Sequence, residues 1–483
     1  MKTMISRSLL AACALAAAAG AASAQTTGYL LSCSPASQLG RGCTLLGGGA
    51  DPATMLSNPA GLASMAGRSV TVSGAAFLPS LEYTNAVNSA VAGAKKVYPL
   101  PAVVFASPSR GALSWGIGAQ TLGGMGADYS LTHALLGAAQ TYHSKFGLME
   151  GGLAVALRLS SKLAVGATVG ALYGQLEFTT PYSVNPMSFQ GLAGLGADPA
   201  YATLMASFHE ATAATALTGL SGFAFAAGGS VEFRPSPTVT LALAYTAPAT
   251  ISLGGGTAAM DMTAQFNQLY TGMVAAKGGD AAAVNTQLAG FGLNMAAGMA
   301  GTFDTKVDFG IPQTLTASLG LAPRPGLTLG LDVSWIGYAS AFKDMPLTMT
   351  GGSNANINIL MNASPTVGTF AASWPLNWKD AWVVRAGGEF AATPRLTLRA
   401  GAVVGTNPVP DNTLFTIFPA IVRDALTAGV AYDIGPAALS VSYAHTFQAS
   451  QTGAATHLVA TEYQNSVNKL AEDTFAAGLT WRF

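Results

Sequence analysis

The sequence carries very little charge. Only 9% of its 483 residues are Asp, Glu, Lys or Arg, and 22 basic residues balance 22 acidic ones. An ordinary soluble domain has about 25% charged residues, so a water-exposed globule is disfavoured. A nucleic-acid binder needs a basic excess, which is missing here. The mean hydropathy of +0.40 excludes a disordered chain, because disorder requires low hydrophobicity.

Long hydrophobic runs are also missing. A helical membrane protein would show repeated apolar stretches of about 20 residues. Half of the residues are nevertheless hydrophobic, and the 57 glycines are well above ordinary usage. A sequence that is hydrophobic without long apolar runs points to a membrane β-barrel.

Residues 1–24 are predicted to be an export signal. A positively charged start precedes the apolar, Ala-rich stretch Ser8–Gly20, and Ala22-Ser23-Ala24 forms a cleavage site before Gln25. A permanent membrane anchor is the alternative, but the apolar stretch is short for one. The motif Leu10-Ala11-Ala12-Cys13 also looks like a lipoprotein cleavage box, although the apolar core before it is short.

Two cysteines remain in the exported chain. Cys33 and Cys43 lie ten positions apart, and an oxidising compartment favours a disulfide between them. Two free thiols are the alternative. Neither cysteine has a histidine nearby that would suggest a metal site, so no metal and no cofactor is expected.

Many stretches alternate between apolar and small or polar residues with period two. The clearest is the last, in which Phe475, Ala477, Leu479, Trp481 and Phe483 share one face. Such alternation is what a strand needs when lipid lies on one side and a lumen on the other.

Fourteen such segments are predicted between residues 68 and 483. They cover 68–78, 98–107, 111–121, 149–159, 162–178, 218–234, 238–252, 304–322, 326–340, 379–392, 395–405, 422–434, 437–449 and 472–483. Short turns alternate with long connections, as in outer-membrane barrels. The fold class is therefore an all-β, 14-stranded antiparallel transmembrane barrel. A soluble β-sandwich or solenoid would also alternate, but it would not normally tolerate so little charge.

The long connections are expected to be partly helical. Residues 191–217 and 260–300 are rich in Ala, Met, Leu and Gln. Phe266, Leu269 and Met273 recur at helical spacing, either to pack on the barrel rim or to line an apolar groove that binds ligand. Residues 347–361 are ambiguous between a fifteenth strand and an extracellular extension, and an even strand count favours the extension.

Residues 25–67 precede the first strand and are Gly-rich. Fourteen strands enclose a lumen too wide for side chains alone to fill. A compact plug inside the barrel therefore fits this segment better than a tail does.

Here the sequence resembles the FadL-type long-chain fatty acid transporters of the outer membrane. The resemblance begins at Leu39-Gly40-Arg41, Asp51 and Ser57-Asn58-Pro59-Ala60-Gly61-Leu62, and continues through Ile311-Pro312-Gln313-Thr314, Asp332-Val333-Ser334-Trp335, Asn407-Pro408-Val409-Pro410 and Ala428-Gly429-Val430-Ala431-Tyr432. It implies a 14-stranded barrel with an N-terminal hatch, and passive uptake of hydrophobic molecules through it.

The resemblance also implies roles for individual residues. Hatch or gate residues would be Asn58, Pro59 and Ala60, and Arg41 with Asp51 would latch the hatch to the wall; Arg41 as an ordinary solvated charge is the alternative. Exit would run sideways through a kink in the third strand, which holds Gly116 and Gly118, with Gly123 just beyond it.

One departure concerns the substrate's head group. Fatty-acid members place basic residues near the ligand carboxylate, whereas Gln175-Leu176-Glu177-Phe178 has none, and Lys343 is the nearest candidate. An uncharged aromatic or alkane hydrocarbon is thus an alternative substrate.

A general porin, or a barrel lipase using His445, is a further alternative, but no metal-ligand or nucleophile motif supports an enzyme. Expected partners are outer-membrane lipids and, through the terminal Phe483, the barrel assembly machinery.

Overall fold

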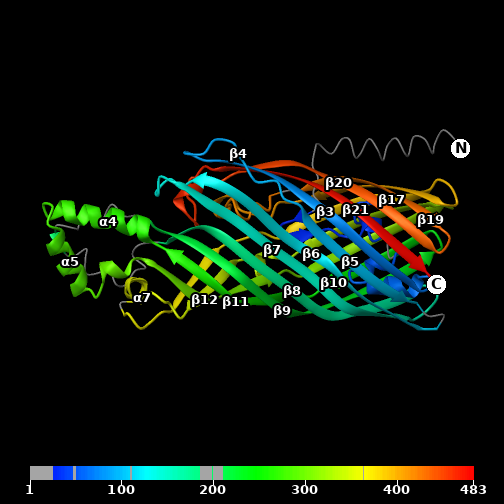
Figure 1. Cartoon of the computed structure of the whole chain (residues 1–483). Helices are drawn as coiled ribbons and strands as arrows, with labels where there is room; N and C mark the ends of the chain where they lie inside the picture. The colour runs from blue at the N-terminus through cyan, green and yellow to red at the C-terminus, as the bar shows by residue number, and fades with distance from the viewer. Residues whose placement is uncertain are drawn as a thin grey trace.

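A closed antiparallel β-barrel forms most of the molecule (Figure 1). The computed structural model describes residues 26–46, 51–108, 111–184, 198–199, 210–362, 364–421 and 423–483. The predicted export signal lies outside these residues, as do residues 191–197 and 200–209 of the helix predicted at 191–217. Residues 211–217 begin a strand that runs from Ala211 to Ser236, so the helix prediction was wrong for that part.

Within the described residues, the barrel has fourteen strands, four of which consist of two segments each. In chain order they are β3 (Ser69–Thr84), β5 (Tyr98–Ser107), β6 (Leu113–Thr132), β7 (Ala139–Arg158), β8 (Leu163–Val184), β9 (Ala211–Ser236), β10 with β11 (Val239–Thr246, Ala249–Asp261), β12 with β13 (Ala300–Ile311, Thr314–Arg324), β14 with β15 (Leu327–Ile336, Asp344–Thr350), β16 with β17 (Phe370–Pro375, Ala381–Ala391), β18 (Leu396–Gly405), β19 (Asp424–Ile434), β20 (Ala437–Thr452) and β21 (Val467–Arg482).

The last strand pairs with the first and closes the barrel. β21 and β3 are antiparallel over their whole length, from Val467 opposite Thr84 to Arg482 opposite Ser69. Closure leaves no sheet edge exposed to lipid along this seam. The predicted fold class and strand number are confirmed.

Several strands are longer than the sequence predicts. β6 and β7 continue to Thr132 and from Ala139, so the predicted long loop 122–148 is mostly strand. Residues 344–350 form the outer half of the ninth strand, paired with β12 and β16, whereas Ala355–Asn362 is the helix α7. Of the ambiguous segment 347–361, residues 347–350 therefore continue the ninth strand and residues 355–361 are helical, so the segment is an extension and not a fifteenth strand.

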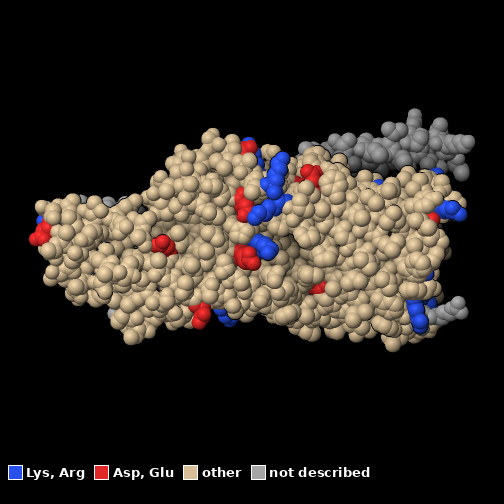
Figure 2. Space-filling view, viewed as in Figure 1, with Lys and Arg blue, Asp and Glu red and all other residues tan. Residues whose placement is uncertain are grey.

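The outside of the barrel is an apolar surface. Phe223 and Phe225 are 71% and 69% exposed, and the other strands present Val, Leu and Ile in the same way. Figure 2 shows wide areas without a charged residue. Such exposure is stable only where lipid covers the band.

Helices cover the end of the barrel that carries the long connections (Figure 1). They are α4 (Thr263–Ala276), α5 (Ala281–Gly290) and α7, with a short 3₁₀ turn at Met295–Ala297. The short helix α6 (Tyr338–Ala341) instead interrupts the ninth strand between β14 and β15 and contacts the hatch. Other connections hold the 3₁₀ turns Asp411–Thr413 and Thr461–Tyr463 and the short strand β4 (Val91–Ala92). The helices predicted within 260–300 are confirmed. No described helix is both long and apolar enough to cross a membrane.

The described residues between 26 and 67 (26–46 and 51–67) lie inside the barrel, and we call them the hatch. Their elements are β1 (Thr26–Thr27), β2 (Leu30–Leu31), α2 (Ala36–Leu39) and the 3₁₀ turns η1 (Pro52–Thr54) and η2 (Pro59–Ser64). α2 contacts β19, β20 and β21, while η2 contacts β7, β8 and β9. The hatch therefore touches widely separated parts of the wall.

Glycines in the wall let the hatch backbone approach closely. A Cβ atom on Gly387 of β17 would overlap the carbonyl of Arg41, and one on Gly401 of β18 would overlap the backbone nitrogen of Gly42. Gly42 itself has a φ of +70°, which a residue with a side chain rarely adopts. The high glycine content thus has a packing reason.

We expect Gly387→Val to expel the hatch without unfolding the barrel. Valine suits a strand, but its Cβ has no room beside Arg41. The variant should still show a folded barrel by heat-modified migration in gels, and its ion conductance in planar bilayers should rise severalfold. Gly147→Val, at a position with nothing within 4 Å, is the matched control and should leave conductance unchanged. Equal conductance in both variants would contradict a seated hatch.

Candidate functional site: the hatch and the gap beside β6

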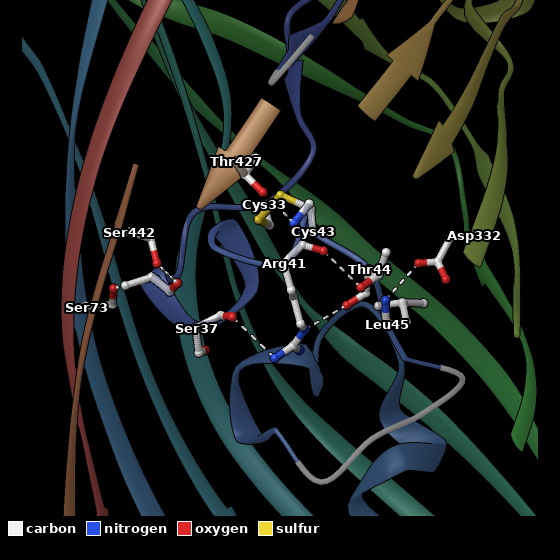
Figure 3. Close-up of a disulfide and its surroundings, with 12 residues drawn as sticks. Cys33, Ser37, Arg41, Cys43, Thr44, Leu45, Ser73, Asp332, Thr427 and Ser442 are labelled. Atoms are coloured by element: carbon white, nitrogen blue, oxygen red, sulfur yellow. Dashed lines mark hydrogen bonds between the residues drawn. A yellow bond between two sulfur atoms is a disulfide. The ribbon is translucent and has the colours of Figure 1, made fainter. Parts of the chain in front are cut away.

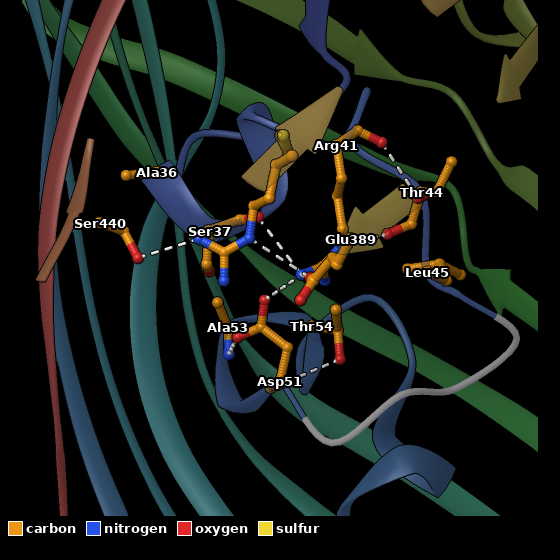
Figure 4. Close-up of polar contacts among 12 residues, drawn as sticks. Ala36, Ser37, Arg41, Thr44, Leu45, Asp51, Ala53, Thr54, Glu389 and Ser440 are labelled. Carbon is orange, nitrogen blue, oxygen red and sulfur yellow. Dashed lines mark hydrogen bonds and ion pairs between the residues drawn. The ribbon is translucent and has the colours of Figure 1, made fainter. Parts of the chain in front are cut away.

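Arg41 holds the hatch together and ties it to the wall. Its guanidinium lies 2.8 Å from the Asp51 carboxylate and 2.6 Å from Glu389 Oε1 on β17 (Figure 4). Arg41 is 1% exposed, so the alternative of a solvated charge is wrong. It also donates to the carbonyls of Ser37 and Thr44, which fixes the loop after α2.

This cluster keeps its charges although it is buried. Burial alone would raise the pKa of Asp51, but the positive charge of Arg41 and the hydrogen bond from Ala53 N–H hold that pKa below its usual value. Burial would likewise lower the pKa of Arg41, and the two carboxylates raise it instead. The three charges therefore depend on one another.

A disulfide and several backbone contacts fix the middle of the hatch. Cys33 and Cys43 are joined by a disulfide (Figure 3). Leu45 N–H donates to Asp332 Oδ2 at 2.7 Å, and Gly42 N–H donates to the Thr427 hydroxyl at 2.9 Å. These bonds reach β14 and β19, so the middle of the hatch is anchored on more than one side of the lumen.

The Asn58-Pro59-Ala60 turn is another anchor. Ala60 N–H donates to the Ser230 hydroxyl at 2.9 Å, and a Cβ on Gly166 would overlap Ala60. Asn58 is fully buried, and its side-chain amide forms no hydrogen bond to the described residues. These contacts hold the turn against the barrel wall. Its role in gating remains a prediction.

A bulge in β6 lies at Leu122. Thr121 pairs with Met149 of β7 and Gly123 pairs with Leu148, which leaves Leu122 as the extra residue. Near the start of β6 the buried residues are even-numbered (Ser114 and Gly116), and from Thr121 beside the bulge onward they are odd-numbered, as at Ala127, Tyr129 and Leu131. Of the three predicted kink residues, only Gly123 lies at the bulge.

Gly116 and Gly118 do not form the kink. They lie in the regular ladder opposite Ala154 and Gly152. A Cβ at either position would press on Met55 of the hatch or on the neighbouring strand. The prediction that they form the kink was wrong. Glycine at these positions allows close packing, not bending.

β5 and β6 separate beside this bulge. Their pairing ends at Ala102 opposite Gln120, so residues 98–101 of β5 have no partner on β6. The carbonyl of Pro101 accepts from the Thr121 hydroxyl at 3.3 Å, so the backbone edge of Pro101 faces β6. Proline has no N–H, and this edge therefore exposes no unpaired donor at Pro101.

A cavity of about 230 Å³ occupies this gap. Its lining is mostly apolar and includes Pro99, Leu100, Met125, Phe146 and Leu148. The polar lining residues include Tyr98, Lys145 and Gln175. On the lumen side the hatch strand β2 closes the gap: Leu30 pairs with Gly123, and Gly124 N–H donates to the Tyr29 carbonyl at 2.9 Å.

The predicted ligand residues lie elsewhere. Phe266, Leu269 and Met273 share the buried face of α4, so this face is covered by packing. Lys343 is exposed at the end of α6 and is not among the residues that line the gap cavity. Ligand contact by these four residues stays a prediction.

Sequence reasoning missed Tyr29, Leu122 and Phe146. Nothing in the local sequence marks these residues. The extra residue in β6 shows only in the structure, where the buried positions change from even to odd numbers. His445 contacts Asp473 at 2.8 Å, and among the described residues no group of three or more His, Cys, Asp or Glu could hold a metal.

With its bore occupied by the hatch and a mostly apolar cavity in its wall, this barrel has the features of an outer-membrane transport protein for hydrophobic compounds. The sequence model of the outer membrane protein transport family (OMPP1/FadL/TodX) matches residues 16–483, and the chain belongs to this family. The family consists of transport channels, and the resemblance seen in the sequence is confirmed. No curated protein matches the sequence.

Solved structures share the fold at low sequence identity. A FadL homologue from Pseudomonas aeruginosa is 14% identical, with a TM-score of 0.69 over 94% of this chain and 100% of that one. The Ralstonia pickettii toluene transporter TbuX is 18% identical, with a TM-score of 0.64 over 93% and 98%. The P. putida toluene transporter TodX is 15% identical, with a TM-score of 0.64 over 93% and 98%.

We expect Arg41→Met to loosen the hatch in a pH-dependent way. Removing one partner of a buried ion pair costs about 3–5 kcal/mol, here through Asp51 and Glu389. In the wild type the pKa of Asp51 is depressed, so its contribution is present above the unfolded pKa and is lost only as pH falls through the lower folded value. In the variant, burial leaves that pKa raised, so acid should stabilise the hatch.

Ion conductance in planar bilayers measures this difference. Near neutral pH, Arg41→Met should conduct more than the wild type. At acid pH its conductance should fall below its own value at neutral pH, because a buried carboxyl with a raised pKa gains its proton there. Arg68→Met, an exposed site at the end of the hatch, is the control and should behave as wild type. A variant that conducts as wild type at both pH values would contradict the clamp.

Proposed function

We propose that the protein takes up long-chain fatty acids or similarly hydrophobic molecules across the outer membrane by passive diffusion, and that they leave sideways through the gap beside β6. The observation that carries this proposal is the cavity of about 230 Å³ between β5 and β6, whose lining is mostly apolar. A molecule in this cavity meets lipid on one side and the hatch on the other. Aromatic or alkane hydrocarbons are the alternative substrates.

The physics of transfer favours several partial sites over one deep pocket. Each buried CH₂ contributes about 0.8 kcal/mol, so complete burial of a long tail would trap it. Entry under the helical loops, a pause beside the hatch and exit through the gap divide this gain into steps. No energy source is needed, because the membrane itself is the favourable end of the path.

The main alternative is a general porin. The hatch contacts the wall on several sides, and a second cavity, between hatch and wall, measures only about 140 Å³. A hydrated sugar needs a continuous wide path, which this arrangement does not offer. Liposome swelling with sugars should therefore stay at background, and rapid swelling would favour the porin.

The proposed function implies two partners. We propose that outer-membrane lipids cover the apolar band that includes Phe223 and Phe225 and receive the transported molecule. The terminal Phe483 is exposed and would be available to the barrel assembly machinery, although its backbone N–H already bonds to Arg68.

We expect deletion of Leu122 to close the lateral exit. Removing the extra residue restores uninterrupted alternation in β6, which would let this strand pair with β5 beyond Ala102. Uptake of radiolabelled palmitate and of toluene by cells that express the variant should fall to background, while the barrel stays folded.

Leu122→Ala is the matched control, since it keeps the bulge and removes only the side chain. It should retain most of the uptake. Undiminished uptake after deletion of Leu122, in a barrel shown to be folded, would rule out exit through this gap.

A further inference from the structure

A belt of charged pairs ends the apolar band on the side of the long connections. Lys469 of β21 lies 2.7 Å from Glu82 of β3, and Lys96, which precedes β5, lies 2.7 Å from Asp128 of β6. The strand neighbours of Glu82, Asp128 and Lys469 are buried, so these charged side chains face away from the lumen. Figure 2 shows acidic and basic side chains gathered midway along the barrel, next to wide uncharged areas. Because charges are costly in hydrocarbon, this outer belt marks the level of the outer lipid head groups.

Lys145 of β7 lies at the outer belt and also lines the gap cavity. Both of its strand neighbours are buried, so Lys145 faces outward. It is paired opposite Gly126 of β6, and it lies two positions from His143, whose ring is 2.6 Å from Asp128 in the belt. The ammonium group is therefore placed where the gap cavity meets the level of the head groups.

The ammonium group of Lys145 has only a weak partner among the described residues. Its distance to Glu177 Oε1 on β8 is 3.9 Å, which is too long for a hydrogen bond. Lys96 and Lys469, in contrast, hold their carboxylates at 2.7 Å. The Lys145 side chain is 54% exposed, and an exposed pair of this kind contributes little to stability. Another carboxylate can therefore take the ammonium group at small cost.

The hydroxyl of Tyr98 adds a second polar group at the same place. Tyr98 begins β5, where β5 and β6 are apart, and its side chain reaches across to β6. A Cβ atom on Gly126 would overlap the Tyr98 hydroxyl, so this glycine leaves room for it. Since Gly126 is opposite Lys145, the hydroxyl lies over the strand next to the ammonium group. Both side chains line the outer end of the gap cavity.

The apolar part of the gap runs from this outer end toward the middle of the membrane. β5 and β6 are apart from residue 98 onward and pair again at Ala102, closer to the end of the barrel with the short turns. Pro99 and Pro101 line the cavity along this stretch, and they also line a groove on the outside of the wall beside Gly74 and Ala76. The gap cavity therefore continues onto an apolar surface that faces lipid.

An acid with a long tail can occupy both parts of the gap at once. An ionised carboxylate is very costly to move into hydrocarbon without a partner. Here the carboxylate would stay at the outer belt beside a cation and a hydroxyl, while the tail passes the two prolines into lipid. The acid would leave in the orientation of a membrane lipid, with its head group outward. A hydrocarbon has no head group and gains nothing from Lys145.

We propose that Lys145, together with the Tyr98 hydroxyl, binds the carboxylate of the transported molecule in the gap beside β6, and that the exit thereby favours ionised acids with one apolar tail over hydrocarbons. This inference rests on the proposed function and narrows its substrate class. Glu177 limits the preference, because its carboxylate competes for the same ammonium group. An incoming acid takes the ammonium group from Glu177, and the departing acid returns it.

Uptake of two molecules with similar tails tests this assignment. Cells that express the full-length protein are given radiolabelled laurate or dodecane, which differ in the carboxylate. Lys145→Gln should slow laurate uptake roughly fivefold and leave dodecane uptake unchanged, because only laurate loses a charged partner. Lys145→Arg should restore most of the laurate rate. Glu177→Gln removes the competing carboxylate and should raise laurate uptake about twofold.

Lys469→Gln is the control, since this lysine lies in the outer belt but is not among the residues that line the gap cavity. It should leave both rates as in the wild type. As the pH falls and laurate gains a proton, the difference between the wild type and Lys145→Gln should vanish.

Two results would overturn Lys145 as the carboxylate partner: equal slowing of laurate and dodecane in Lys145→Gln, or laurate uptake by this variant at the wild-type rate. If the wild type takes up neither molecule, the proposed function itself fails. If it takes up both and Lys145→Gln changes neither rate, only this inference fails.

Discussion

The bore of this barrel is wider than its own side chains can fill, and the backbone of the hatch fills it. Small barrels of about eight strands are packed solid by inward side chains, whereas fourteen strands are not. The wall therefore presents glycine where the hatch approaches, as at Gly387 and Gly401, and donors or acceptors where the hatch backbone needs partners, as at Asp332 and Thr427. This closure of the bore is the reason we propose the wall as the route for an apolar molecule.

The barrel itself was predictable because its cause is local. Lipid outside and small or polar groups inside impose a period of two on every strand, and the terminal strand from Val467 to Arg482 shows it in the sequence. The extent of the strands was less predictable, since β6 and β7 stay paired up to Thr132 opposite Ala139, through most of the predicted loop 122–148. The kink was assigned to Gly116 and Gly118 because glycine permits bending, but in this wall glycine more often permits contact with the hatch.

The candidate site was only partly predictable because it is made by contacts across the lumen. Arg41 and Asp51 were candidates from the family resemblance, yet the partner on the wall, Glu389, lies 348 positions from Arg41. Tyr29 meets rings as far away as Trp378, and no spacing within the sequence connects them. Such contacts depend on how the hatch is placed in the barrel, so the pattern along the chain carries no signal for them.

The central claim is that the hatch closes the bore and that its first residues, 26–32, which cover the gap beside β6, must move before an apolar molecule can leave, and hydrogen–deuterium exchange tests it most directly. Peptides covering residues 26–32 and the backbone amide of Gly124 should exchange faster when toluene is added to the protein in nanodiscs. Peptides from Cys33 to Ser64 should keep their protection, because the disulfide, the Arg41 ion pairs and the Ala60 contact hold them. Faster exchange throughout the hatch, or no change at residues 26–32 under saturating ligand, would contradict the account.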